Sequence, residues 1–345
     1  MSAGRTYWRV AGRRVAFRVD ARAVAVGAAL LAVCVCLAVL GLAVGELPLS
    51  LAEVWGALTG AGEDFTRTVV LEWRLPRVLA ALVCGAALGA SGAVFQSLTR
   101  NPLASPDILG FSAGAYTGAL IVIIVLGGGY LAVAAGALVG GLAAAALVSL
   151  LAFRGGMQGF RLIVVGIAVS AMLSSLNTWL TLTADLETAI VAAVWGAGSL
   201  NGTTWQQAGA GSVLILVLLG IALLLARPLR QLELGDDAAQ ALGVHVTRTR
   251  LLLMLVSVAL IAVVTAAAGP IAFVALAAPQ LARRVARSPG VSIPVSALMG
   301  AALLAASDFA ALTAFPAMLP VGTVTVVFGG AYLLWLLVRE ARRRF

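Results

Sequence analysis

The sequence has no lysine, a single histidine and few charged residues of any kind. All 23 basic residues are arginine, and charged residues make up only 11% of the 345 positions, against 62% that are hydrophobic. Soluble globular domains carry about 25% charged residues, so the composition excludes that class. Without lysine the chain cannot build a Walker A loop, whose lysine holds the nucleotide phosphates. If ATP drives this protein, we expect another chain to hydrolyse it.

Reactive and metal-binding side chains are also scarce. The lone histidine, His245, lies in a polar loop, where we expect a solvated surface residue. No cluster of His, Cys, Asp and Glu has metal-ligand spacing. The three cysteines lie inside apolar runs and are expected to pack as small apolar residues, namely Cys34, Cys36 and Cys84. We therefore expect no catalytic residue, metal site or cofactor in this chain. A membrane enzyme would need a cluster of catalytic residues, and the sequence shows none.

Apolar runs long enough to cross a bilayer recur along the whole chain. They predict an all-α polytopic membrane protein with one transmembrane domain over residues 1–345 and no soluble domain. We expect a short additional helix at the outer face, at 188–195. Pro279 predicts that the eighth span is broken or partly re-entrant. The ten predicted spans are 23–44, 78–98, 109–126, 131–153, 162–183, 208–226, 251–268, 271–282, 291–306 and 321–338.

The arginines give this map an orientation. With ten spans and a cytoplasmic N-terminal arm (1–22), 20 of the 23 arginines fall on the cytoplasmic side. The three outside arginines, Arg67, Arg74 and Arg77, all lie in the first external connection, which also contains the amphipathic, interface-seeking segment SLAEVWGAL. This asymmetry is the positive-inside rule. It places both termini and the loop 227–250 in the cytoplasm.

The loop 227–250 contains a short segment, GDDAAQALG, that reads as a helix marked at both ends. Asp237 is the predicted N-cap, with Gln240 three residues later in capping-box spacing. Gly243 stands where such a helix would stop. A capped helix between two membrane spans, flanked by arginines, is a surface that a cytoplasmic partner can grip.

Ion-coupled transporters usually carry ionisable residues at mid-membrane depth. Asp107 and Asp308 lie near the ends of predicted spans, where we expect interfacial positions. This disfavours an ion-coupled secondary transporter, which stays open as an alternative because sodium can also be held by backbone carbonyls.

Six segments, in order and with matching spacing, resemble the FecCD family, the permease subunits of bacterial ABC importers for iron-siderophore complexes, haem and vitamin B12. The resemblance covers about residues 23–340. The segments are RLPR at 74–77, GAALGASGAVFQSLTRNPLASPDILGFSAGA at 85–115, WGAGSL at 195–200, LGDDAAQALGV at 234–244, GPIAFVALAAPQLAR at 269–283, and LPVGTVTVVFGGAYLLWLL at 319–337.

The resemblance implies a type II importer permease in the bacterial cytoplasmic (inner) membrane, with ten helices. Its implied partners are a second permease subunit, identical or different, two ATPase subunits that bind ATP and Mg, and an extracytoplasmic binding protein that delivers the cargo. A ferric siderophore is the favoured cargo, with vitamin B12 or haem as alternatives.

The resemblance also implies roles for particular residues. The ATPase-coupling residues would be Leu234, Gly235, Ala238, Ala241, Leu242 and Gly243. Binding-protein docking would use Arg74 and Arg77, with Arg67 as a weaker candidate; the alternative is that Arg74 and Arg77 only snorkel at the membrane surface. The translocation path would be lined by Ser170, Met172, Ser174, Asn177 and Thr181.

Overall fold

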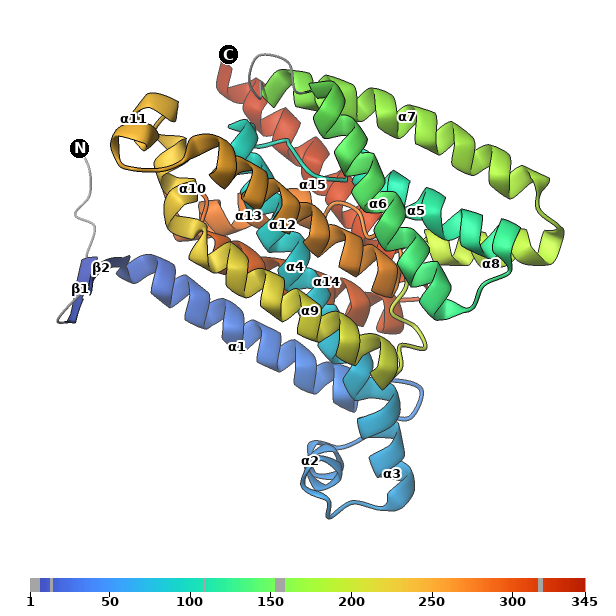
Figure 1. Ribbon diagram of the computed structural model, residues 1–345. Coiled ribbons are helices and arrows are strands. Elements are labelled where there is room, and N and C mark those ends of the chain that lie inside the picture. Colours follow the sequence, from blue (N-terminus) through green and yellow to red (C-terminus); the bar gives the residue numbers. More distant parts are fainter. Residues whose placement is uncertain (1–6, 13–14, 108, 153–158, 316–318, 345) are drawn as a thin grey trace.

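The computed structural model describes residues 7–12, 15–107, 109–152, 159–315 and 319–344. Its long helices run between two ends of the molecule (Figure 1). The helices α10 (Ala226–Glu233) and α11 (Asp236–Ala241) lie toward one end, and α2 (Leu51–Thr59), α3 (Asp64–Thr68) and α8 (Leu186–Gly196) lie toward the other. The expected end of the fourth span at 153 falls outside the described residues.

A β-hairpin precedes the first helix. β1 (Tyr7–Gly12) pairs antiparallel with β2 (Val15–Asp20). α1 (Ala21–Ala43) follows directly, and the Asp20 carboxylate accepts a hydrogen bond from the backbone N–H of Arg22 at 2.9 Å. The helix agrees with the first predicted span. The hairpin is not among the predicted elements, because the arginines dominate the composition of this arm and hide its short alternating strands.

A small lobe follows α1. α2 (Leu51–Thr59) begins with a capping box, in which Ser50 and Glu53 exchange side-chain-to-backbone hydrogen bonds. α3 (Asp64–Thr68), the π-helical segment η1 (Val69–Arg74) and α4 (Leu75–Thr99) then form one continuous helix of 36 residues. The prediction began this helix at 78, because the polar side chains of its outer part lower the hydropathy without breaking the helix.

The next stretch forms α5 (Phe111–Leu120) with the π-helical segment η2 (Ile121–Leu126), α6 (Tyr130–Ala152), α7 (Gly159–Thr183) and α8 (Leu186–Gly196). α5 and α6 meet backbone to backbone, since a Cβ on Gly118 would overlap the carbonyl oxygen of Gly136. Small residues permit such close approach of membrane helices. α8 lies where the short outer helix is predicted.

The chain then forms α9 (Trp205–Leu224), α10 (Ala226–Glu233), α11 (Asp236–Ala241) and α12 (Val246–Ala268). α10 is not among the predicted elements. Pro228 lies in its first turn, where a missing N–H does no harm. Leu229 and Leu232 are buried and hold α10 against the core, which compensates for its polar composition.

Three helices complete the chain, α13 (Val274–Ala286), α14 (Ile293–Thr313) and α15 (Val321–Arg344). The break predicted at Pro279 in the eighth span is wrong. α13 has only 13 residues, but it continues through Pro279. The irregular backbone precedes the helix, at 269–273, where Phe273 has a φ of 67°.

α4 is the central helix of the molecule. It packs against α9, α12, α13 and α14, and most of its length is buried. Gly85, Gly89 and Gly300 bring α4 and α14 into backbone contact, because a Cβ on Gly85 or Gly89 would overlap the backbone of α14. Small residues permit this close approach of the two helices.

Seven helices of the described chain are long and apolar enough to cross a membrane, including α1, the α3–α4 helix, α6, α7, α9, α12 and α14. The other three predicted spans correspond to α5 with η2, α13 and α15, whose described apolar parts are shorter than 18 residues. α5 with η2 covers 111–126, α13 has 13 residues, and the apolar part of α15 covers 321–335. A straight crossing of the hydrocarbon core takes about 20 residues, so length and composition alone support seven crossings.

Candidate functional site

The loop between α9 and α12 carries α11 at its tip. Gly235 precedes α11 with a φ of 116°, and Gly243 follows it with a φ of 84°. Both values lie in the range that favours glycine. After the helix, the N–H groups of Gly243 and Val244 donate to the carbonyls of Gln240 and Ala239. The predicted helix and its stop at Gly243 are confirmed.

The predicted N-cap is wrong. α11 begins at Asp236, one residue before the predicted cap Asp237, and its N-cap is Gly235, which has no side chain to offer. Asp236 and Asp237 both lie in the first turn, where carboxylates interact favourably with the positive end of the helix. The start of α11 is therefore stabilised by the two carboxylates of its first turn and by the positive φ that Gly235 can adopt.

Ion pairs tie α11 to the membrane helices beside it. The Arg250 guanidinium on α12 donates two hydrogen bonds to the Asp236 carboxylate, at 2.6 and 2.8 Å. Arg100, just after α4, lies 3.8 Å from the same carboxylate and donates to the carbonyl of Leu232 at 3.1 Å. Bidentate pairs of this kind fix orientation as well as distance. These contacts connect α11 to α12 and to the end of α4.

A second contact joins α10 to α4. The Ser97 hydroxyl on α4 donates to the Glu233 carboxylate at the end of α10. The sequence gives no signal for Ser97, Arg100 or Glu233 at this site, because their partners lie more than a hundred residues away. Arg250 can be singled out from the sequence, because it is one of the arginines that flank the α11 segment.

The six predicted coupling residues lie at the surface of this loop. Leu234 and Leu242 expose 68% and 56% of their surface, which is unusual for leucines outside lipid. Ala238, Ala241 and Gly243 are also exposed, and Gly235 is partly exposed. Ala239 points inward and is fully buried. The loop therefore has a rigid inner face and an apolar outer face.

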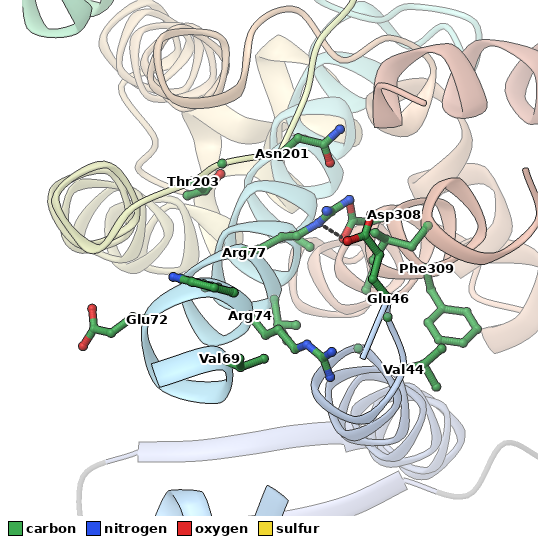
Figure 2. Close-up of a pocket in the computed structure, with 18 of the residues that line it drawn as sticks. Val44, Glu46, Val69, Glu72, Arg74, Arg77, Asn201, Thr203, Asp308 and Phe309 are labelled. Carbon is green, nitrogen blue, oxygen red and sulfur yellow. Dashed lines mark hydrogen bonds and ion pairs between the residues drawn. The ribbon is translucent and has the colours of Figure 1, made fainter. Parts of the chain in front are cut away.

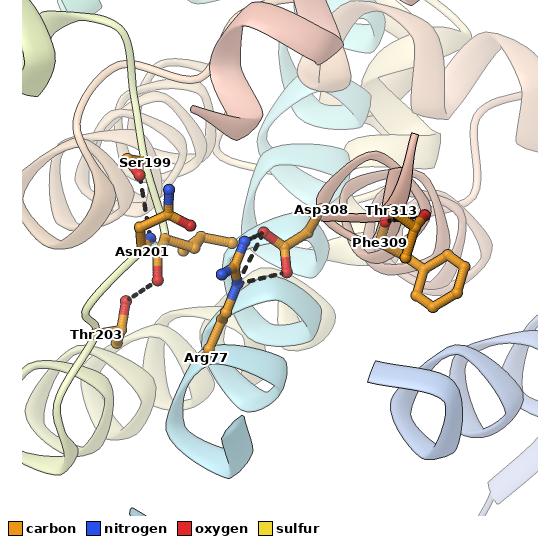
Figure 3. A network of polar contacts seen from close by, with 8 residues as sticks. Arg77, Ser199, Asn201, Thr203, Asp308, Phe309 and Thr313 are labelled. Carbon is orange, nitrogen blue, oxygen red and sulfur yellow. Dashed lines mark hydrogen bonds and ion pairs between the residues drawn. The ribbon is translucent and has the colours of Figure 1, made fainter. Parts of the chain in front are cut away.

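At the opposite end of the helices, Arg77 on α4 pairs with Asp308 on α14. The guanidinium donates through Nε and Nη2 to both carboxylate oxygens, at 2.8 to 3.2 Å (Figure 3). The side chains keep only 12% and 6% of their surface exposed. Asp308 was expected to be interfacial, and the structure places it in a buried ion pair that joins two packed helices.

Arg74 is also engaged within the chain. Its guanidinium donates to the carbonyls of Leu42 and Ala43 at 2.7 and 3.2 Å, and to the carbonyl of Leu47. These include carbonyls of the last turn of α1, which no later N–H of the helix reaches. Arg67 keeps 43% of its side chain exposed and lies 3.9 Å from Asp64. Of the three predicted docking arginines, only Arg67 is directed to the surface.

A cavity of about 330 Å³ opens beside these arginines, between the end of α1, η1, α4, the 201–204 loop and α14. Figure 2 shows Arg77 and Asp308 facing each other in it, with Glu46 nearby and Glu72 pointing away from the pair. Glu46 and Glu72 are exposed. The cavity therefore has a neutral ion pair inside and carboxylates around it.

The predicted path residues on α7 do not share one face. Asn177 is buried, where its side chain accepts a hydrogen bond from Thr117 at 2.7 Å and donates to the carbonyl of Ala113 at 3.3 Å. Met172 and Ser174 are exposed. Ser170 and Thr181 are partly buried. Thr117 on α5 is the neighbour that sequence reasoning missed.

α7 nevertheless has a large uncovered surface. Only 22% of its apolar window is buried inside the chain, one of the lowest shares among the candidate spans. α8, beside the end of α7, is capped by Asp185, which accepts a hydrogen bond from the N–H of Thr188 at 3.0 Å. That bond lowers the pKa of Asp185 below its ordinary value. The described chain therefore leaves one side of α7 uncovered.

Chemistry-bearing groups are sparse in the part of the chain that the structure covers. No group of three or more His, Cys, Asp or Glu residues could hold a metal ion among these residues. His245 is exposed at the foot of α12. Cys34, Cys36 and Cys84 are free thiols. The described residues instead provide an exposed short helix, α11, and a buried ion pair between Arg77 and Asp308.

A multi-pass bundle with an exposed, braced helix at one end and no reactive cluster among the described residues is the architecture of a membrane permease subunit. Residues 30–339 match the FecCD transport family. The chain belongs to this family, whose members here are permeases for siderophores, haem and iron citrate.

Individual relatives agree with this class. The chain is 51% identical to the ferric enterobactin transport system permease protein FepG of Escherichia coli over 89% of this chain and 93% of the relative. It is 38% identical to the hemin transport system permease protein HmuU of Yersinia pestis, over 87% and 91%. A metal-chelate type ABC transporter, solved in an inward-facing conformation, superimposes with a TM-score of 0.81 at 29% identity, over 92% of this chain and 99% of that one.

Proposed function

We propose that this chain is a permease subunit of an ABC importer that carries a ferric-siderophore complex across the bacterial cytoplasmic membrane. The observation that carries the proposal is the 51% identity, over 89% of the chain, to a permease for ferric enterobactin. Haem is the second candidate cargo, supported by the 38% identity to a hemin permease. Vitamin B12 stays the third candidate cargo.

The proposed topology has ten crossings with both termini in the cytoplasm. In addition to the seven long helices, α5 with η2, α13 and α15 cross the membrane. The distribution of arginines supports this orientation, with α11 on the cytoplasmic side. The arm 1–22 and the loop 227–250 then face the same compartment.

The proposed partners are a second permease subunit, two ATPase subunits and an extracytoplasmic binding protein. ATP and Mg are bound by the ATPase subunits, and this chain contributes no cofactor site. Leu234 and Leu242 insert into the ATPase surface, where their exposed apolar area becomes buried. The bidentate Asp236–Arg250 pair then carries the ATPase movement into α12 and the end of α4.

The second permease subunit covers the exposed side of α7, and the path runs between the two subunits. Ser170, Met172, Ser174, Asn177 and Thr181 stay the proposed path residues, with the exposed Met172 and Ser174 better placed for it than the buried Asn177. No high-affinity cargo site is needed in the path, because the binding protein selects the cargo.

The binding protein docks on the end that carries α2, α3 and α8. Arg67 is the exposed arginine of the three proposed docking residues. Carboxylates of the binding protein reach Arg74 and Arg77 only by competing with the α1 carbonyls and with Asp308. Docking through those two arginines therefore requires a local rearrangement.

Reconstitution tests this proposal. Vesicles that contain the chain with its second permease and ATPase subunits, and a binding protein loaded with a ferric siderophore, should accumulate iron only with ATP. Omission of the ATPase should abolish uptake. Uptake by the lone chain in response to an ion gradient would contradict the proposal and favour a secondary transporter.

A further inference from the structure

α2 has two apolar sides, and only one of them is covered by the chain. Val54 and Ala57 are buried against Leu42, Ala43 and Val70 of the neighbouring helices. Leu51, Trp55 and Leu58 lie on a second side and remain exposed, Trp55 by 68%. At roughly 100° per residue these three fall within about 60° of one another. The same geometry puts Glu53 on the opposite side of the helix.

The position of α2 relative to α1 sets its depth. α1 has 23 residues and a length of about 34 Å at 1.5 Å per residue, slightly more than a hydrocarbon core of about 30 Å. α2 packs against Leu42 and Ala43, which are the last residues of α1, as Figure 1 also shows. α2 is therefore level with the outer headgroup layer of the bilayer.

α1 is the natural continuation of this surface toward the lipid. Only 11% of its apolar window is buried, and large apolar side chains such as Leu31 and Val35 are exposed along its length. A helix at the edge of the bundle with this pattern faces acyl chains. The exposed side of α2 begins where that lipid-facing surface ends, which favours lipid over water as its surroundings.

The chemistry of α2 fits the interface between acyl chains and headgroups. Tryptophan is enriched at that level, because its ring is apolar and its N–H is polar. The exposed side carries no charge, while Glu53 is held on the other side by its hydrogen bonds with Ser50. α2 has no basic residue, so its contact with lipid relies on apolar burial and not on anionic headgroups.

We propose that α2 is an interfacial anchor that lies in the outer headgroup layer and inserts Leu51, Trp55 and Leu58 into the lipid boundary. The anchor fixes the height of η1 and of Arg74, which bonds to the end of α1 beside it. The inference concerns the membrane surface and is independent of the cargo and of the ATPase.

Fluorescence quenching tests the anchor. A version in which Trp55 is the single tryptophan, with the six others changed to phenylalanine, is placed in phosphatidylcholine nanodiscs. Phosphatidylcholine brominated near the carbonyl end of the acyl chain quenches fluorophores in the lipid, and iodide quenches those in water. A matched control carries Trp55→Phe with Ala52→Trp, which places the reporter about 60° around the helix from Trp55 and about 90° from the middle of the exposed side.

Bromolipid should quench Trp55 about twofold more than the Ala52→Trp reporter, and iodide should show the reverse order. Equal bromolipid quenching at both positions, or stronger iodide quenching of Trp55, would overturn the proposal and show a water-exposed face open to a protein partner. If the single-tryptophan version does not fold, the difference between the parent and Trp55→Phe gives the same comparison.

Discussion

At the scale of single residues, Arg77 shows how a partner far along the chain decides what a side chain does. From the sequence, Arg77 is one of three arginines outside the membrane, which favours docking or snorkelling. In the structure its guanidinium is paired with Asp308, 231 residues away, inside the contact between α4 and α14. Neither local spacing nor composition contains that pairing, so the sequence could place Arg77 but not its partner.

Loss of one partner of this pair should be costly. Arg77→Gln leaves the Asp308 carboxylate buried without its cation, which typically destabilises a protein by about 3–5 kcal/mol. The thermal midpoint of the purified protein in detergent should fall clearly. Replacement of both residues by leucine should be milder than Arg77→Gln alone, because no charge is then left unpaired.

The matched comparison for this prediction is Arg67→Gln. Arg67 keeps 43% of its side chain exposed and its ion pair with Asp64 is 3.9 Å long, so a change of less than about 1 kcal/mol is expected. Equal loss of stability in Arg67→Gln and Arg77→Gln would contradict a structural role for the buried pair.

Substitution of Leu242 tests the proposed contact with the ATPase most directly. A charge at this exposed leucine would have to be buried in the ATPase interface without a partner. Leu242→Glu should therefore reduce co-purification of the ATPase at least about tenfold, while the melting temperature of the permease stays unchanged. Thr247→Glu adds the same charge in the exposed first turn of α12 and should keep the ATPase bound. Unchanged co-purification of Leu242→Glu would remove α11 from the interface.

At the scale of elements, the link between α11 and α12 makes a different prediction from the interface itself. Asp236→Asn weakens the bidentate contact with Arg250. The Asp236 side chain is 43% exposed, so we expect a loss of only about 1 kcal/mol in the free energy of unfolding. ATPase association should persist, but less transport should occur per ATP hydrolysed. Asp237→Asn is the control, because Asp237 forms no ion pair within the described residues. Equal coupling ratios in the two variants would show that the pair does not transmit movement.

The elements themselves were predictable where composition decides them. Long apolar runs gave α1, α6, α7 and α9 to within a few residues, because lipid or burial on all sides demands apolar side chains. The outer half of the α3–α4 helix, α10 and the N-terminal hairpin were missed, because their polar residues carry no hydropathy signal. The N-cap of α11 was misplaced by two residues, since Gly235 caps through backbone conformation that spacing does not reveal.

At the scale of the whole molecule, the fold explains how a chain with so little chemistry can support transport. α4 lies at the centre, braced at one end by Arg77 and Asp308 and joined at the other to α10 and α11 by Ser97 and Arg100. The same central helix therefore connects the proposed docking surface with the proposed ATPase surface. The composition predicts a membrane protein, but it does not predict which distant residues contact the two ends of α4.

The most direct test of the central claim is uptake of iron-labelled ferric enterobactin into vesicles that contain this chain, its second permease subunit, its ATPase subunits and a loaded binding protein. The proposed function predicts uptake that requires ATP and stops when the ATPase is omitted or when Leu242→Glu replaces the parent chain. ATP-independent uptake driven by an ion gradient through this chain alone would contradict it.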